Sequence, residues 1–207
     1  MEDYMKKRFW IAALAVLIAL TITACPEDDN NDSGPAISTI NFEPDGNGFY
    51  QFYTNDSQNC GYAFWSVFSN TNGNDTYQIE CKKISGANNY PYGMVFGVSD
   101  SNSRQLYYLY IDINGYYYVG KLNGSVNTKI IDWTLSSKLH TGYNVMNTLK
   151  VVKNGTNFTI YFNDDSTPVT FSDSEISGNR VGFSASVGAK SAESFPDTPV
   201  DIRFRQK

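Results

Sequence analysis

Few residues of this chain could act in catalysis or bind a metal ion. Only one of its 207 residues is a histidine, His140, so sites that need two or three imidazoles are excluded. Any catalytic triad would depend on this one side chain, and no recognisable serine or cysteine nucleophile motif lies near it. The neighbours of His140 are typical of a loop, and we interpret it as a surface residue.

Paired carboxylates are the other pattern that would indicate hydrolytic chemistry. A retaining glycosidase holds its acid and its nucleophile about 5 Å apart, which residues two apart on one strand face can achieve. Asp173 and Glu175 have this spacing, but the flanking Ser172 and Ile176-Ser177-Gly178 are typical of a turn. We interpret both carboxylates as loop charges and predict no catalytic residue.

Acidic and amide side chains gather in three segments that could offer oxygen ligands to calcium. Segment 28–32 lacks the central Gly and the terminal Glu of an EF-hand loop. Segments 72–75 and 100–102 consist of Asn, Asp, Gly and Ser, which are ordinary turn formers. We therefore predict neither a metal site nor a cofactor.

The amino-terminal residues have the pattern of an export signal. Lys6-Lys7-Arg8 precedes an apolar run over residues 9–20, which is shorter than the roughly 20 residues of a membrane-spanning helix. The sequence Ile22-Thr23-Ala24-Cys25 resembles the end of a bacterial lipoprotein signal, in which the cysteine is lipidated and becomes the new amino terminus. We predict that residues 1–24 are a signal peptide and that a lipid on Cys25 anchors the exported protein to a membrane, on its periplasmic or cell-surface side. The alternative is ordinary secretion after the same cleavage.

Residues 25–35 would connect the lipid to the folded part. Positions 26–35 hold four acids and no base, so they cannot bury apolar surface, and we predict a flexible tether. The signal peptide takes three basic and two acidic residues with it, which leaves 13 bases and 19 acids, a net charge of −6. Nucleic acid is therefore not an expected partner, whereas a membrane is, through the lipid.

Two cysteines remain once Cys25 is assigned to the lipid. Cys60 and Cys81 form an even pair in an exported, oxidising setting, which predicts a disulfide between them. Two unbridged buried thiols are the alternative, because a bridge needs a particular separation of the two Cα atoms.

From residue 36 onward the pattern is that of strands. Short segments of β-branched and aromatic residues alternate with clusters of Asn, Gly, Asp and Ser, and no long stretch has helical spacing. We predict that residues 36–207 form an all-β domain, a two-sheet antiparallel β-sandwich or jelly roll. The candidate strands are 37–42, 48–53, 62–68, 76–84, 92–99, 105–113, 116–121, 129–133, 147–153, 157–163, 169–171, 180–187 and 200–205.

The turn Asn114-Gly115 predicts the register of one hairpin. This pair is preferred in two-residue type I′ loops, which would place Ile113 opposite Tyr116. Side chains alternate across a sheet, so one face would be apolar and the other would mix aromatic with charged groups. The mixed face, which we predict to bind a ligand by stacking and hydrogen bonding, carries Tyr108, Tyr110, Asp112, Tyr117 and Lys121. The alternative is that loops or neighbouring strands cover this face and the tyrosines only pack there.

A second hairpin is predicted at Asn154-Gly155. The same turn type would pair Val151 with Phe158 and Leu149 with Ile160 on the core face. Its other face is plainly polar, and the contrast between the two hairpins is what points to the first one as the ligand surface.

Segments rich in Gly, Asn and aromatic residues follow one another in an order similar to that of a known fold. They are YGMVF (92–96), LYYL (106–109), GYYYVGK (115–121), IDW (131–133), NTLKV (147–151), TIYFN (159–163) and SGNRVGF (177–183). In this order they resemble the concanavalin A-like lectin/glucanase jelly roll. More narrowly, they resemble the laminin-G-like modules of bacterial lipoproteins and the domain named for 3-keto-disaccharide hydrolases. The resemblance covers about residues 60–205, and its motifs specify a fold better than an activity.

The resemblance implies a function that involves carbohydrate. Glucanases of this fold carry catalytic carboxylates alternating along one strand, and no candidate strand of this sequence has that pattern. We therefore predict a non-enzymatic module with a shallow glycan-binding face. The alternatives are a glycoside-cleaving enzyme of the 3-keto-disaccharide hydrolase type and a structural surface protein without a sugar ligand.

Overall fold

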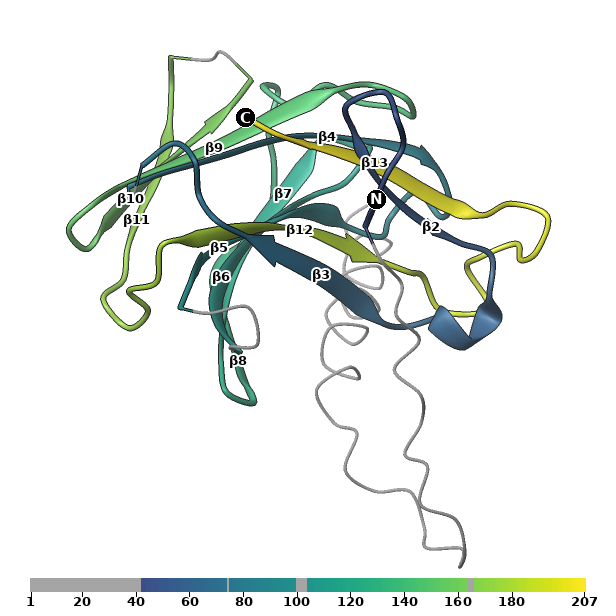
Figure 1. The fold of residues 1–207 in the computed structure, drawn as a ribbon, viewed down its shortest axis with the longest axis horizontal. Helices are drawn as coiled ribbons and strands as arrows, with labels where there is room; N and C mark the ends of the chain where they lie inside the picture. Colours follow the sequence, from purple (N-terminus) through teal and green to yellow (C-terminus); the bar gives the residue numbers. More distant parts are fainter. Residues whose placement is uncertain (1–41, 74, 100–103, 164–165) are drawn as a thin grey trace, which may run out of the picture.

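The computed structural model describes residues 42–207, except 74, 100–103 and 164–165 (Figure 1). The predicted signal peptide, the predicted lipidation site Cys25 and the predicted tether lie outside the described residues. The described part includes no helix that could span a membrane.

The described chain folds into thirteen strands and one 3-10 turn. The strands are β1 (Glu43–Pro44), β2 (Tyr50–Thr54), β3 (Ala63–Phe68), β4 (Thr76–Ser85), β5 (Tyr92–Val98), β6 (Gln105–Ile111), β7 (Tyr116–Asn123), β8 (Val126–Leu135), β9 (Asn147–Asn154), β10 (Asn157–Phe162), β11 (Val169–Ser172), β12 (Arg180–Ser186) and β13 (Val200–Gln206), with η1 (Ser57–Asn59) between β2 and β3. Twelve of the predicted strands are thereby confirmed. The predicted strand 37–42 lies outside the described residues except for Phe42, which is not in a strand.

The strands form two antiparallel sheets packed as a β-sandwich of the jelly-roll type, as predicted. The seven-stranded sheet has the order β1-β2-β13-β4-β9-β10-β11, and the six-stranded sheet has the order β3-β12-β5-β6-β7-β8. In Figure 1, β9, β4 and β13 run across the upper part of the view, β12 and β3 lie below them, and β8 extends downwards.

The main core lies between the two sheets and is rich in aromatic rings. Phe96 of β5 contacts Phe158 of β10 with 6.0 Å between ring centroids, and Phe183 of β12 stacks on Phe204 of β13 at 5.0 Å. Each of these pairs joins one sheet to the other, and such a pair contributes about 0.5–1.5 kcal/mol beyond the area that it buries. The period-two alternation of the strands therefore places their apolar residues as the sequence predicts.

A second apolar cluster lies on the outer face of the six-stranded sheet. Its buried members are Val95, Val98, Leu106, Tyr108, Tyr110 and Leu122, and its partly buried members are Trp65, Val67, Tyr118 and Trp133. A sandwich needs only the inner face of each sheet to be apolar, so this outer cluster is an addition to the fold.

The predicted register of the first hairpin is wrong by one residue. Ile111 pairs with Tyr117, and the loop spans the four residues from Asp112 to Gly115. The cause is Asp112, whose carboxylate accepts hydrogen bonds from the backbone N–H groups of Asn114 and Tyr116, both at 2.9 Å. Because the side-chain period is two, a slip of one residue moves Tyr117 into the core.

The second hairpin slips by two residues, which preserves its faces. Asn154 pairs with Asn157 around the loop Gly155-Thr156, so Val151 pairs with Ile160 rather than with Phe158. Leu149, Val151, Phe158 and Ile160 are nevertheless all buried, as predicted. An even slip changes the partners of each residue but not the side of the sheet that it faces.

The predicted disulfide is not formed in the structure. Cys60 and Cys81 are free thiols, which corresponds to the alternative interpretation of these residues. Cys81 is fully buried among the core residues of β4, and burial raises the pKa of its thiol. Cys60 lies at the end of η1, partly buried against the same core.

Candidate functional site

The five residues of the predicted ligand patch are not brought together. Tyr108 and Tyr110 lie on the outer face of the six-stranded sheet, but only 3% and 4% of their surfaces are exposed. Tyr117 packs in the main core, with its ring 4.9 Å from that of Phe162. Asp112 is buried in the turn that it stabilises, and burial raises the pKa of its carboxyl group although the turn's N–H groups counteract this.

The fifth residue of the patch, Lys121, holds the two carboxylates that have a glycosidase-like spacing. Its Nζ atom forms ion pairs with both Asp173 and Glu175. The Tyr107 hydroxyl also donates to Asp173 at 2.6 Å, and the Asn123 amide donates to Glu175 at 2.8 Å. Partial burial raises the pKa of Asp173, but the bonds from Lys121 and Tyr107 outweigh it, so the pKa lies below its ordinary value.

The same lysine lowers the pKa of Glu175. A glycosidase needs one of its two carboxyl groups to stay protonated as the general acid, and here both are stabilised in the ionised form. The arrangement is a clamp that fixes the segment before β12 to β7.

The single histidine also has no catalytic surroundings. His140 is exposed, and its Nδ1 atom lies 3.0 Å from the carbonyl oxygen of Met146. Its backbone N–H donates to the side-chain oxygen of Asn147, and the side-chain amide N–H of Asn147 donates to the carbonyl oxygen of His140. These contacts shape a loop, as the sequence predicted.

The outer face of the six-stranded sheet carries candidate ligand-binding residues other than the predicted patch. One row of cross-strand partners runs over five neighbouring strands, and its members are Trp65, Ser184, Gly93, Tyr110 and Tyr118. Trp133 on β8 continues this row, because its ring lies 5.3 Å from that of Tyr118. The two tryptophans thus mark the two edge strands of the sheet, about 24 Å apart at the usual strand spacing.

Two tyrosines of β6 lie across this sheet, each passing a glycine of the neighbouring strand. The Tyr110 hydroxyl passes β5 at Gly93 and lies 3.0 Å from Oγ of Ser184. The Tyr108 hydroxyl passes over Gly120 of β7 and donates to the side-chain oxygen of Asn127 on β8. A β-carbon at Gly120 would stand 2.3 Å from the Tyr108 hydroxyl oxygen, so any side chain there would displace the ring.

The tyrosine rings form a continuous layer. Tyr108 stacks on Tyr118 with 5.9 Å between centroids and 8° between ring planes, and it contacts Tyr110 at 4.8 Å. Burial raises the pKa of Tyr110 to about 12 and also raises that of Tyr118, so the phenols remain neutral hydrogen-bonding groups. We call the set Trp65, Tyr108, Tyr110, Tyr118 and Trp133 the aromatic face.

The aromatic face contains three residues that the sequence prediction missed. Trp65, Tyr118 and Trp133 are only partly buried, so their rings are more available than those of Tyr108 and Tyr110. Tyr118 was missed because the wrong register turned it towards the core. The two tryptophans could have been found, since each stands within a segment that was predicted to be a strand.

The aromatic face has the chemical character of a surface for sugars. Flat rings pack against the apolar C–H faces of sugar rings, while Asn127 and the exposed Lys129 on β8 offer polar groups beside them. The described residues include no group of three or more His, Cys, Asp or Glu that could hold a metal ion.

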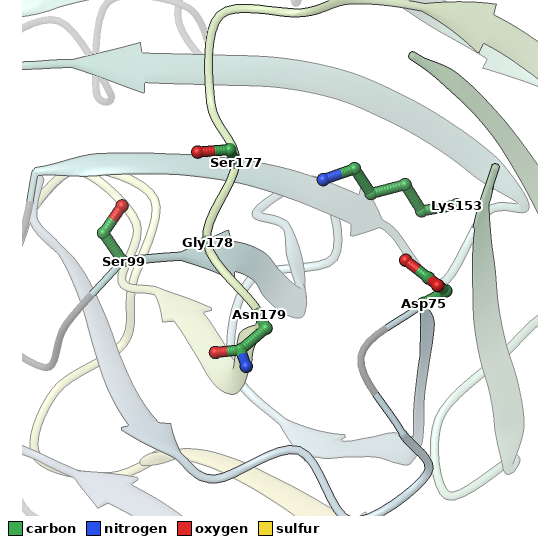
Figure 2. A pocket seen from close by; sticks show the side chains of 6 residues that line it. All are labelled: Asp75, Ser99, Lys153, Ser177, Gly178 and Asn179. Atoms are coloured by element: carbon green, nitrogen blue, oxygen red, sulfur yellow. The ribbon is translucent and has the colours of Figure 1, made fainter. Parts of the chain in front are cut away.

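A separate polar pocket of about 430 Å³ lies where strands of the two sheets end. It is lined by Asp75, Ser99, Lys153, Ser177, Gly178 and Asn179. Figure 2 shows the side chains of these residues arranged around one space, with the backbone at Gly178 along it. Asp75 is the only one of these residues that the sequence offered as a possible ligand, in segment 72–75, and the pocket itself was not predicted, because the lining residues come from four distant parts of the chain.

Comparison with known proteins supports the fold. No family model matches this chain, and no curated protein matches its sequence. The chain is similar to a GH43 protein, BlXynB of Bacillus licheniformis, with 13% identity and a TM-score of 0.50. That similarity covers 76% of this chain but only 32% of the enzyme.

Two further solved structures are more distantly similar. One is the carbohydrate binding module CBM66 from Bacillus subtilis, with 17% identity and a TM-score of 0.47, over 77% of this chain and 80% of the module. The other is CG-16, a homodimeric agglutinin from chicken liver, with 8% identity and a TM-score of 0.40, over 69% of this chain and 98% of the agglutinin. At these identities the similarities concern the fold alone, a two-sheet β-sandwich.

Proposed function

We propose that this chain is a non-enzymatic glycan-binding module that is held on a membrane by a lipid on Cys25. The observation that carries the glycan-binding part is the aromatic face, where two partly buried tryptophans stand at opposite edges of one sheet with a layer of tyrosines between them. A sandwich does not need such a layer for its own core, so the layer calls for a separate explanation.

The shape of the row indicates what kind of glycan would fit. Trp65 and Trp133 stand on the two edge strands of the sheet, and the rings of Tyr110 and Tyr118 lie between them. The distance from Trp65 to Trp133 is several times the width of one sugar ring. An extended oligosaccharide, which contacts both tryptophans, therefore fits this surface better than a monosaccharide does.

The non-enzymatic part of the proposal rests on the surroundings of Asp173 and Glu175. Asp173 and Glu175 are the pair that the sequence offers for glycoside cleavage, and Lys121 holds both in the ionised form. If the protein cleaved glycosides instead, its general acid would have to be a residue other than Asp173 or Glu175.

The anchoring part rests on the sequence alone. The predicted tether, residues 25–35, would separate the lipid from the folded domain by at most about 40 Å when fully extended. Such a tether would let the aromatic face turn towards soluble or surface-bound glycans. Metabolic labelling with a fatty-acid analogue tests this part: label should enter the wild type and not Cys25→Ala, and label retained in Cys25→Ala would contradict it.

A glycan array of neutral oligosaccharides tests the binding part. The chain without residues 1–24 should bind at least one extended glycan, and Trp65→Ala should weaken this binding by about tenfold or more, as the loss of a stacking contact does. Tyr53→Ala is the matched control, because Tyr53 is an exposed ring on β2 of the other sheet. An array without any bound glycan would favour the structural surface protein instead.

A further inference from the structure

The polar pocket beside Lys153 is built by contacts that do not belong to the aromatic face. Asp75 precedes β4, Ser99 follows β5, Lys153 lies in β9, and residues 177–179 precede β12. The pocket therefore joins both sheets.

Gly178 fixes the backbone that forms one side of this pocket. A β-carbon at this position would lie 2.2 Å from the carbonyl carbon of Val98, so the chain can approach β5 this closely only with glycine. The hydroxyl of the buried Tyr77 donates to the carbonyl oxygen of Gly178 at 3.0 Å. Ser177 and Asn179, on either side of Gly178, are thereby held at the pocket.

Lys153 is held in a similar way on the opposite side. Its backbone N–H donates to the carbonyl oxygen of Asp75 at 2.7 Å, and its Nζ atom lies 6.0 Å from the centre of the Phe158 ring. In Figure 2 its ammonium group points into the pocket on the side of Ser177, away from the carboxylate of Asp75. Among the described residues no ion pair joins Lys153 to a carboxylate, and Lys153 lines the pocket.

We propose that this pocket binds the carboxylate of an acidic sugar, a hexuronate residue of a glycan. The proposal rests on the proposed glycan-binding function and names a sugar class for a second site. The Lys153 ammonium binds the carboxylate, with the hydroxyls of Ser99 and Ser177 as neighbouring donors. The Asp75 carboxylate, on the other side, accepts hydrogen bonds from the sugar hydroxyls, and the volume of about 430 Å³ is within the range of small-ligand sites.

Titration calorimetry with oligogalacturonate tests this site. The ligands are the acidic oligosaccharide and its carboxyl-reduced, neutral counterpart, and the protein is the chain without residues 1–24. The acidic form should bind about tenfold more tightly than the neutral form, and Lys153→Gln should remove this difference. Lys150→Gln is the matched control, because it removes the same charge from the same strand at a lysine that lies over Tyr161 instead.

The results separate this proposal from the proposed function. Equal affinity for both ligands, or an unchanged preference in Lys153→Gln, would overturn the hexuronate site. A Trp65→Ala variant that keeps its preference for the acidic ligand would show that the pocket works independently of the aromatic face. Binding of neutral glycans at the aromatic face together with no response to oligogalacturonate would overturn the pocket alone.

Discussion

The hydroxyl of Tyr110 on β6 reaches Oγ of Ser184 on β12 at 3.0 Å, although a whole strand lies between them. Ser184 itself donates to the carbonyl oxygen of Phe64 at 3.1 Å, so Tyr110 is the donor in the first bond. The first bond connects β6 to β12, past Gly93 of β5, and the second connects β12 to β3. The aromatic face is therefore part of the stability of the sheet and not a set of loose surface rings.

Removal of the Tyr110 ring should consequently cost stability. Tyr110→Phe should lower the free energy of unfolding by about 1 kcal/mol, because it removes one buried hydrogen bond. Tyr110→Ala should lower it by about 3–5 kcal/mol, because it opens a cavity in a nearly fully buried position. Urea unfolding of both variants measures this, and a loss below about 1 kcal/mol in Tyr110→Ala would show that the ring is not packed as described.

Gly120 should be coupled to Tyr108. Gly120→Ala would bring a β-carbon to 2.3 Å from the Tyr108 hydroxyl oxygen, and the forced shift should cost about 1–3 kcal/mol. The same substitution in a Tyr108→Ala background should cost much less, because the clash is gone. A double-mutant cycle of unfolding free energies measures the coupling, and additive effects would contradict the geometry.

The ion pairs of Lys121 with Asp173 and Glu175 should contribute less to the free energy of unfolding at low pH. The folded-state pKa values of Asp173 and Glu175 lie below their ordinary values, so their contribution is present above pH values of about 4 to 5 and disappears as pH falls through the folded-state values. Lys121→Met should therefore be less stable than wild type at pH 7, and the difference should shrink below pH 4. Lys129→Met, which removes an exposed ion pair with Asp132, is the control and should change little at either pH. A gap between wild type and Lys121→Met that stays constant from pH 7 to pH 3 would contradict the clamp.

Lys83 should also make stability rise with pH, but in alkaline solution. Its fully buried ammonium group donates to the carbonyl oxygens of Ala87 at 2.5 Å and Tyr90 at 3.2 Å, and burial lowers its pKa from 10.5 to about 8. Between pH 8 and 10.5 the unfolded chain then binds more protons than the folded one, so stability relative to Lys83→Met should rise with pH over this window. Unfolding curves of both proteins at pH 7.5 and pH 10 test the sign, and a difference that falls with pH would contradict it.

The sequence was sufficient for the strands but not for their pairing. Alternation of apolar residues located twelve strands, because each one needs only local information. The hairpin at Asn114-Gly115 failed because the preference of the Asn-Gly pair was outweighed by the hydrogen bonds of Asp112, one residue earlier. The slip was odd, so it exchanged Tyr117 and Tyr118 between the two faces, whereas the even slip at Gly155 left the faces unchanged.

The two candidate sites depend on contacts between distant parts of the chain. The row from Trp65 to Tyr118 exists because β12 lies between β3 and β5, an order that no local pattern contains. The pocket at Lys153 likewise combines residues from the ends of four strands. Periodicity finds which residues face outwards, but the order of the strands decides which of them become neighbours.

The central claim is tested most directly through the tryptophans. The chain has three, and Trp10 lies in the predicted signal peptide, so after cleavage only Trp65 and Trp133 would remain, both on the aromatic face. An NMR titration of the ¹⁵N-labelled chain without residues 1–24, with a neutral oligosaccharide selected on the array, follows both indole N–H signals. The account predicts that both signals shift along one saturable curve. Saturable binding that leaves both indole signals unmoved would contradict it.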